Sequence, residues 1–356
     1  MKDEVGFAVV GCGVIGRTHA DQAVSCEGAY LAAVVDEAPE RAQAFARRYG
    51  VPGYSNLEEV LQREDIDVVT VATPSGSHGD VAMRAARAGK HVIVEKPIEV
   101  TLEKADAMIT VCRENGVKLC VVSQHRFDPS TIAVKRHIDE GRFGKMLLGE
   151  ATVHWYRSQA YYDSGDWRGT WKLDGGGALM NQSIHTIDLL QHLMGPVERI
   201  YAHAGTFNHE RIEVEDAAVA VLRFRGGGIG TIVGTTLAYP GLSARVEVFG
   251  ESGTAVIDGD RLTHLYVRSQ EATGGSSYGD QAAVNKATTV GEVGSAAADP
   301  SAVSGGGHAA QFIDMIQAIR EDREPLVNGA EGKKPLAIIL GIYESARTGR
   351  EVHLPL

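Results

Sequence analysis

The first 122 residues alternate short apolar runs with helical patterns, and this alternation restricts the fold more than any other feature of the sequence. The runs are almost continuously apolar, which is typical of parallel strands buried on both faces. They lie at 6–10, 30–35, 67–72, 91–95 and 118–122, and the helical patterns lie at 16–25, 39–49, 77–88 and 101–115. Such alternation predicts a doubly wound parallel sheet of the Rossmann type.

The pattern changes after Gln124, where strand candidates follow one another without intervening helices and predict an antiparallel sheet. Strand candidates lie at 145–157, 197–207, 215–225, 228–237, 244–250 and 254–259, and helical patterns at 130–140, 178–194, 308–321 and 331–348. Residues 271–307 are rich in Gly, Ser, Ala and Thr and predict a long surface loop. Because 356 residues exceed one typical core, we expect two domains, a Rossmann domain over 1–124 and an α+β domain over 125–356.

Charge and composition argue against several classes of function. The net charge of −11, without a Lys/Arg stripe to neutralise phosphates, argues against a nucleic-acid partner. No apolar run approaches the roughly 20 residues of a membrane span, and the N-terminus has no pattern of a secretory signal. The four cysteines are scattered without a C-x-x-C, so we expect reduced thiols in a cytoplasmic protein and no metal site.

A glycine-rich turn follows the first predicted strand. VVGCGVIG places Gly11, Gly13 and Gly16 in the spacing G-x-G-x-x-G, with Val14 and Ile15 before the last glycine. The first glycine permits a tight turn, the second lets backbone approach a pyrophosphate, and the third allows close helix–strand packing. The following helix N-terminus offers unpaired N–H groups to phosphates. A glycine-rich turn without a ligand is the alternative.

Asp36 supports dinucleotide binding, because it ends the second predicted strand 20 residues after Gly16. An acid at this place accepts hydrogen bonds from the adenosine ribose hydroxyls. Asp36 is followed by Glu37, and no Arg occurs before Arg41, so a 2′-phosphate would be repelled. The sequence therefore favours NAD over NADP.

Two further segments end predicted strands, on the side where open α/β sheets bind ligands. ATPSGSH contains Thr73, Pro74 and His78 at the end of the third strand. VEKP contains Glu95 and Lys96 at the end of the fourth. By position alone, Lys96 fits a ligand contact and an ordinary surface lysine equally well.

The segment DGGGALMNQSIHTID, from Asp174 to Asp188, begins a predicted helix with three glycines, which would let backbone approach a cofactor and substrate closely. At roughly 100° per residue, Asn181, His185 and Asp188 share one narrow stripe with His192. A surface helix normally carries Lys, Arg and Glu there, so this titratable stripe suits a cleft. Histidine exchanges protons near neutral pH, which makes His185 a candidate base, with a structural histidine as the alternative.

Aromatic residues are concentrated just before these glycines. Residues 154–171 contain six Trp and Tyr, including Tyr156, where the overall aromatic content of 6% predicts about one. Aromatic faces pack against the C–H faces of sugar rings, while Tyr and Trp also donate hydrogen bonds. These rings indicate either a sugar site or the core of the second domain.

These motifs resemble the Gfo/Idh/MocA family of oxidoreductases, which includes glucose–fructose oxidoreductase and inositol dehydrogenase. The resemblance is carried by G-x-G-x-x-G with Asp36, Thr73-Pro74 with His78, Glu95-Lys96-Pro97, and the three glycines followed by His185 and Asp188. It spans essentially the whole chain and implies a second domain with a large open sheet that binds substrate and forms a homodimer or homotetramer. It also implies NAD(P)-dependent oxidation or reduction of a sugar or polyol.

The resemblance assigns roles to individual residues. Lys96 matches the family's catalytic lysine and His185 its catalytic histidine. Asn181 stands where many members carry Asp, which leaves the substrate and the proton route open. Trp167 and Arg168 resemble a family position at the junction of cofactor and substrate, where they and Tyr156 would contact substrate. The implied cofactor contacts are Gly11, Gly13, Val14, Ile15, Gly16, Asp36, Thr73, Pro74, His78, Glu95 and Lys96.

Three functions stay open. The leading one is an NAD-dependent sugar or polyol dehydrogenase, in which Lys96 polarises the substrate oxygen and His185 takes its proton. The second is a dehydrogenase or reductase of a nucleotide sugar. The third is an NAD-binding regulator without catalysis, which would be expected to lack the lysine or the histidine.

Overall fold

A computed structural model of the chain describes residues 4–268, 283–287 and 305–356. The chain divides into two compact units, and it first passes from one to the other after Gln124. Two later segments, Gly165–Gly176 and Gly305–Leu336, belong to the first unit. Each unit is therefore built from separate stretches of the chain.

The first unit contains a six-stranded parallel sheet in the order β3-β2-β1-β4-β5-β6. Its strands are β1 (Val5–Val10), β2 (Ala29–Val35), β3 (Gly53–Tyr54), β4 (Val68–Val71), β5 (His91–Val94) and β6 (Leu119–Val121). Its helices include α1 (Val14–Ser25), α2 (Pro39–Tyr49), α3 (Leu57–Leu61), the short 3₁₀ turn η1 (Ser75–Ser77), α4 (His78–Arg87), α5 (Leu102–Glu114) and α9 (Gly305–Arg320). This strand order is that of dinucleotide-binding folds, so the predicted Rossmann sheet is confirmed.

Burial explains why these strands could be recognised. Every residue of β1 and β4 is buried, as expected for central strands covered on both faces. Two short elements, β3 and α3, were not predicted, because two and five residues carry too little periodicity. Phe312 of α9 stacks on Phe7 of β1 with ring centroids 5.2 Å apart, so a helix late in the chain completes this core.

The second unit contains an eight-stranded sheet in the order β13-β12-β11-β7-β10-β9-β8-β14. Its strands are β7 (Met146–His154), β8 (Val197–Gly205), β9 (Ala217–Phe224), β10 (Ile229–Thr235), β11 (Arg245–Gly250), β12 (Gly253–Asp258), β13 (Arg261–Val267) and β14 (Val352–His353). Every neighbouring pair is antiparallel except β7 with β10, so the mostly antiparallel sheet is confirmed. The sequence-based prediction missed β13, which follows β12 after a tight turn at Gly259 and Asp260.

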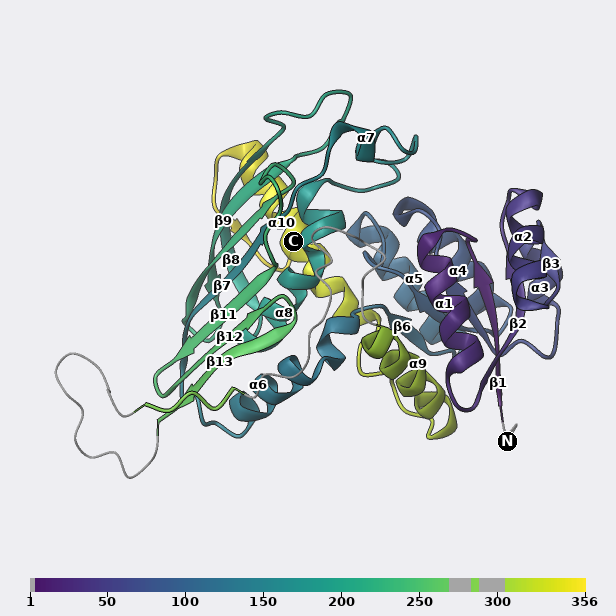
Figure 1. Ribbon diagram of the computed structural model, residues 1–356, viewed down its shortest axis with the longest axis horizontal. Helices are drawn as coiled ribbons and strands as arrows, with labels where there is room; N and C mark the ends of the chain where they lie inside the picture. The colour runs from purple at the N-terminus through teal and green to yellow at the C-terminus, as the bar shows by residue number, and fades with distance from the viewer. Residues whose placement is uncertain (1–3, 269–282, 288–304) are drawn as a thin grey trace. The chain divides into compact units, whose positions relative to one another are not determined.

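Among the residues that the structure describes, helices cover one face of this sheet and leave the other open (Figure 1). The helical elements are the turn η2 (Gln124–Phe127), α6 (Pro129–Asp139), α7 (Gln159–Tyr162), the π-helical turn η3 (Ala178–Ser183), α8 (Ile184–Met194) and α10 (Gly329–Thr348), whose first residues belong to the first unit. α8 packs on β7 and β11, and α6 packs on β12 and β13 (Figure 1). On the opposite face, Val219 and Val221 of β9 are 52% and 53% exposed.

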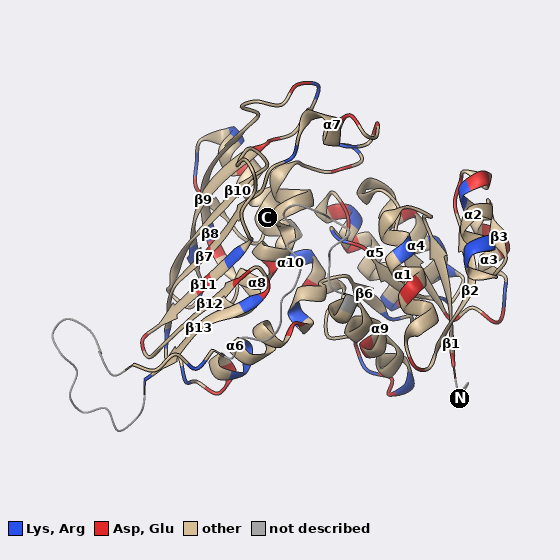
Figure 2. Ribbon diagram, viewed as in Figure 1, with Lys and Arg blue, Asp and Glu red and all other residues tan. Residues whose placement is uncertain are grey.

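The remaining expectations concern loops and charge. Of the loop predicted at 271–307, residues 271–282 and 288–304 lie outside the described residues, and Gly305–Gly307 form the first turn of α9. Within the described part of the chain, no helix is both long and apolar enough to cross a membrane. Acidic and basic residues are interspersed along both units (Figure 2).

Candidate active site

The glycine motif has the geometry that a dinucleotide phosphate requires. Gly11 has a φ of +101°, and a Cβ there would lie 2.4 Å from the carbonyl oxygen of Ala72. A Cβ on Gly16 would lie 1.9 Å from the carbonyl oxygen of Gly11, whereas the space at Gly13 is open. Gly13 is the N-cap residue of α1, whose first turn has neither a side-chain cap nor an acidic residue among the described residues. The N–H groups of α1 thus remain for an anion, beside a Val14 side chain that is 75% exposed.

Asp36 lies next to this turn at the end of β2. Its carboxylate accepts hydrogen bonds from the backbone N–H groups of Cys12 (2.8 Å) and Ala38 (2.9 Å). A guanidinium nitrogen of Arg41 lies 4.0 Å away. An ionised carboxylate has about four acceptor sites, so Asp36 keeps capacity for the hydroxyls of a ribose. The adjacent Ile15 side chain is half-buried.

His78 joins two loops at the carboxyl ends of the strands. Its ring is buried, with Nδ1 2.8 Å from the carbonyl oxygen of Pro97 and Nε2 2.9 Å from that of Thr73. Burial lowers the pKa of His78, although both carbonyl contacts oppose this shift. Because the protein uses both ring nitrogens, His78 positions the loops, while Thr73 is half-buried and Pro74 is exposed.

Glu95 is a buried carboxylate directly before the candidate lysine. Its Oε1 accepts a hydrogen bond from Nε2 of His19 (2.9 Å), and Nε2 of His308 lies 3.9 Å from the same oxygen. Its Oε2 accepts the backbone N–H of Lys96 (3.0 Å). Burial opposes ionisation, but the histidines and Lys96 outweigh it and hold the pKa of Glu95 well below its usual range. The sequence did not indicate either histidine, since both are distant from Glu95 along the chain.

Lys96 is half-buried at the end of β5, and its peptide bond to Pro97 is cis. Burial lowers the pKa of its ammonium group, Glu95 and Asp174 act to raise it, and Arg168 acts to lower it. Asp174 is itself buried. Sequence reasoning did not select Asp174 as a site residue, and its place before three glycines was the only available signal.

Trp167 and Arg168 also belong to the first unit, in the segment Gly165–Gly176. The guanidinium of Arg168 lies over the Trp167 ring, 4.5 Å from its centroid. Both side chains are half-buried. A planar cation held on an aromatic face is well suited to a carboxylate, phosphate or hydroxyl-rich ligand.

Two of the three glycines are required by contacts within the protein. Gly175 has a φ of +79°, and a Cβ there would lie 2.5 Å from a methyl group of Val100. A Cβ on Gly177 would lie 1.9 Å from the carbonyl oxygen of Glu215. The expected close approach to cofactor and substrate is therefore replaced, at these two positions, by close approach to protein atoms.

The helix predicted at 178–194 begins with the π-helical turn η3 and continues as α8. The wider turn breaks the 100° periodicity, so residue counting does not place Asn181 on the stripe of His185. Asn181 is half-buried and donates its backbone N–H to the carbonyl oxygen of Gly177 (3.1 Å). His185 is the second residue of α8 and is also half-buried. π-Helical turns occur frequently at functional sites.

His185 shares a pocket of the second unit with His125. The two rings meet edge to face, with centroids 5.2 Å apart. Nδ1 of His125 lies 2.8 Å from a carboxylate oxygen of Asp128 and 3.3 Å from one of Asp260. Burial lowers the pKa of His125, but these carboxylates outweigh it and raise the pKa overall. The pocket is also lined by Trp155, Gln182, Thr186 and Arg245.

Asp188 is paired with Arg126 of η2. Nε and Nη2 of the guanidinium donate to the two carboxylate oxygens at 2.8 Å and 2.6 Å. Both side chains are buried, and both lie in the second unit. This bidentate pair gives Asp188 a structural role, and it anchors α8 to the start of the unit.

We expect Asp188→Ala to destabilise the protein, because it leaves a buried guanidinium without this carboxylate. Breaking a buried ion pair in this way costs roughly 3–5 kcal/mol of unfolding free energy. Urea denaturation followed by circular dichroism measures the loss. Asp139→Ala, which removes an exposed ion pair with Lys135, is the matched control and should change stability little. Equal losses in both variants would contradict the structural role.

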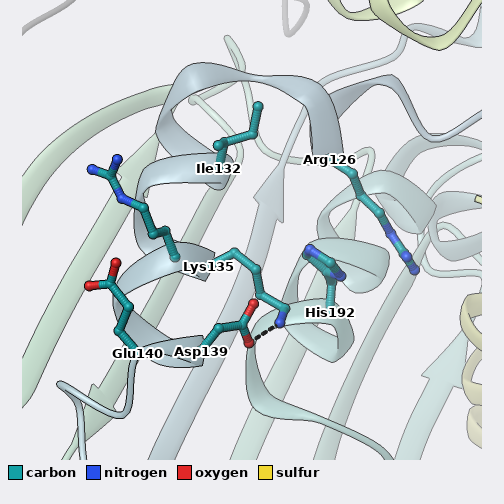
Figure 3. Close-up of a pocket in the computed structure, with 7 residues that line it drawn as sticks. Arg126, Ile132, Lys135, Asp139, Glu140 and His192 are labelled. Atoms are coloured by element: carbon teal, nitrogen blue, oxygen red, sulfur yellow. Dashed lines mark hydrogen bonds and ion pairs between the residues drawn. The ribbon is translucent and has the colours of Figure 1, made fainter. Parts of the chain in front are cut away.

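His192, the last residue of the predicted stripe, lines a different pocket of the second unit. Figure 3 shows its ring on α8 opposite side chains of α6, with Lys135 and Asp139 joined as an ion pair. The pocket is also lined by Arg126, Ile132, Arg136 and Glu140. His185 and His192 therefore line different pockets, although both belong to the stripe predicted from the sequence.

The aromatic rings of residues 154–171 also lie in different surroundings. Tyr162 is buried and its hydroxyl lies 3.0 Å from that of Thr236, which fits the core alternative. Tyr156 is 39% exposed and meets Tyr239 edge to face at 5.3 Å. Trp155 lines the pocket of His185. Trp155 and Tyr156 are thus candidates in this segment for contact with a ligand of the second unit.

Comparisons with known proteins match both parts of the chain. A family model described as an oxidoreductase family with an NAD-binding Rossmann fold matches residues 5–123, and one described as the GFO/IDH/MocA C-terminal domain matches residues 131–256. The chain is 32% identical to scyllo-inositol 2-dehydrogenase (NAD(+)) of Bacillus subtilis, over 78% of this chain and 80% of that protein. It is 29% identical to myo-inositol 2-dehydrogenase of Thermotoga maritima, over 76% and 80%. The crystal structure of the WlbA dehydrogenase from Bordetella pertussis with NADH and UDP-GlcNAcA is 35% identical, with a TM-score of 0.84 over 99% of both chains.

Proposed function

This chain belongs to the Gfo/Idh/MocA family of oxidoreductases, and from that membership we infer that it is an NAD-dependent dehydrogenase of sugars, polyols or their derivatives. The observation that carries the inference is Lys96, a half-buried lysine with a lowered pKa at a strand end of the NAD-binding unit. Its neighbours Glu95 and Asp174 are buried carboxylates, and both interact electrostatically with the ammonium group. An ordinary surface lysine has no such neighbours.

NAD fits the first unit, since α1 keeps an uncapped N-terminus, Gly13 leaves open space and Asp36 offers ribose acceptors. Bound NAD supplies the hydride acceptor for oxidation of an alcohol, and the reduced form supplies the hydride for the reverse reaction. The chain must bind the alcohol, stabilise charge on its oxygen and remove its proton.

Two residues divide these tasks in our proposal. Lys96 donates a hydrogen bond to the substrate oxygen and stabilises the negative charge that develops on it. His185 accepts the hydroxyl proton in oxidation and returns it in reduction. Asn181 contacts a substrate hydroxyl as a neutral group, in place of the charged Asp of many relatives. Trp155, Tyr156 and the Trp167–Arg168 pair supply faces and hydrogen bonds to a ring substrate.

We expect Asp36→Ala to weaken NAD binding, because the ribose loses an ionised acceptor. Hydrogen bonds to charged groups contribute about 1.5–3 kcal/mol, which corresponds to roughly a tenfold to hundredfold rise in Kd. The affinity for NADP should rise relative to NAD, because the repulsion of a 2′-phosphate is removed. Titration calorimetry with both cofactors measures the ratio. Asp80→Ala, at an exposed position of α4, is the control, and an unchanged NAD to NADP ratio in Asp36→Ala would refute the assignment.

A nucleotide sugar is the second candidate substrate. It is favoured by the 35% identity to a WlbA dehydrogenase whose structure holds UDP-GlcNAcA, a likeness that covers 99% of both chains. Arg245, which lines the pocket of His185, and Arg168 are cations that would pair with the carboxylate or diphosphate of such a substrate.

A substrate panel tests the function and separates its classes. Purified protein is mixed with free sugars, inositols and nucleotide sugars, with NAD or NADP, and nicotinamide absorbance is followed. We expect turnover with NAD in one of these classes. Tight NAD binding without any turnover would instead favour a regulator.

Assembly and location complete the proposal. The open face of the second sheet carries half-exposed Val219 and Val221, and burying it between copies of the chain would form a homodimer or homotetramer. Sedimentation of the purified protein measures this state. The four cysteines are free and buried, which suits the reducing cytoplasm.

A further inference from the structure

One residue of the second unit, Glu215, holds the start of the helix that carries His185. Its Oε2 accepts the backbone N–H of Gly177 (3.0 Å), and its Oε1 accepts that of Leu179 (2.8 Å). Its backbone carbonyl accepts the N–H of Ala178 between them (3.0 Å). Three consecutive N–H groups at the entrance to η3 thus have acceptors from a single residue.

These N–H groups need such acceptors. The first N–H groups of a helix have no partner within the helix, and Gly177 has no side chain with which to cap them. Gly177, Ala178 and Leu179 are all buried, so an unpaired N–H here would be costly. The side chain of Glu215 therefore replaces the cap that the local sequence lacks.

The carboxylate of Glu215 also accepts a hydrogen bond from a side chain of α10. Tyr343 of α10 donates its hydroxyl to Oε1 (2.9 Å), and among the described residues it is the only ionisable side chain hydrogen-bonded to this carboxylate. The neighbouring Asp216 serves a different loop, where it accepts the backbone N–H groups of Phe207, Asn208 and His209. The two adjacent buried carboxylates thus organise separate segments.

We propose that Glu215 is a positioning residue of the active site, whose ionised carboxylate fixes the π-helical turn and thereby places Asn181 and His185 for the reaction. This inference rests on the proposed function of His185. It differs from that function because Glu215 touches the backbone of η3 and acts through it.

The ionised form is required because a protonated carboxyl turns one acceptor oxygen into a donor, leaving fewer acceptors for three donors. Burial raises the pKa of Glu215 to about 7, although the N–H groups of Leu179 and Gly177 and the Tyr343 hydroxyl lower it. The cap is therefore completed as the pH rises through about 7. A carboxyl with a raised folded-state pKa stabilises the fold most when protonated, so this stabilisation falls as the pH rises from the ordinary value of 4.5 to about 7. Ionised Glu215 therefore orders the start of η3, although this form contributes less to the free energy of unfolding than the protonated form does.

Glu215→Gln tests the inference, since Gln keeps the shape but offers one acceptor oxygen and no charge. We expect kcat to fall about tenfold to hundredfold with an unchanged Kd for NAD. Amide hydrogen exchange over 177–185 should accelerate, and the component of the pH–kcat profile near 7 should disappear. Glu213→Gln, the same change at an exposed position two residues earlier, should do neither.

Tyr343→Phe provides a second, milder test. It removes a donor that lowers the pKa of Glu215, so the midpoint of the pH–kcat profile should move to higher pH, with kcat recovered above it. Carbon-13 NMR of the glutamate carboxyls follows the same titration without turnover. An unmoved midpoint would overturn the titration of Glu215 as its cause.

Unchanged kcat and unchanged exchange in Glu215→Gln would overturn the positioning role. This result is distinguishable from failure of the proposed function, which would appear as full activity in a His185 variant. The exchange measurement reports on η3 in either case, because it requires no substrate.

Discussion

Replacing Lys96 by alanine should lower kcat by roughly 10²–10³-fold and leave the Kd for NAD close to that of the wild type. The loss has this size because a preorganised donor to a developing oxyanion contributes about 2.7–4 kcal/mol to the transition state. Stopped-flow nicotinamide absorbance measures the chemical step, and calorimetry measures NAD binding. Turnover near wild type in a variant that binds NAD normally would exclude Lys96 from the reaction.

Two further variants control this result. Lys96→Arg keeps the charge but replaces a compact ammonium group by a larger, planar guanidinium group, so it should restore little activity. Lys333→Ala removes a half-buried lysine of the same unit, paired with Asp106, and should leave kcat unchanged. Because burial lowers the pKa of Lys96, its ammonium donor is lost at a lower pH than for an exposed lysine. The alkaline decline of wild-type activity should begin correspondingly early.

Replacing His185 by alanine should also lower kcat strongly, by about 10²–10⁴-fold, which is the usual contribution of a positioned acid or base. The acid limb of the pH–kcat profile should change its shape, because the group that takes the substrate proton is gone. Binding of NAD should not change, since the glycine motif and Asp36 lie in the first unit.

His192→Gln is the matched control for this variant. It removes a histidine from the same helix, but one that lines the separate pocket with α6. It should retain wild-type kcat and pH dependence. Comparable losses in the two variants would show that α8 tolerates no substitution, and the assignment of His185 as the base would lose its support.

The elements that could be predicted from sequence were those with a long local pattern. The buried strands of the Rossmann sheet are apolar runs, and the glycine spacing marks its first turn. The parallel pairing of β7 with β10 could not be predicted, because register between distant strands has no local signal. The same reason hid the contribution of α9 to the first core, where Phe312 stacks on Phe7.

The candidate site shows the same contrast between residues with a local sequence signal and residues without one. Motif residues such as Lys96 and His185 were recognisable, whereas their supporting groups were not. Glu215 reaches Gly177 from 38 positions away, and His19 reaches Glu95 from 76 positions away. Helical counting assumes 3.6 residues per turn, and this assumption does not hold in the π-helical turn that contains Asn181.

The division of each unit into separate stretches has a consequence for how the protein is made. The chain passes between the units five times, and the last passage, at Leu336, falls within α10. During synthesis, β1 leaves the ribosome long before the α9 helix whose Phe312 covers it. The cofactor-binding unit thus cannot finish its core until nearly the whole polypeptide is available. Neither unit, as its contacts define it, is therefore encoded by a single contiguous gene segment.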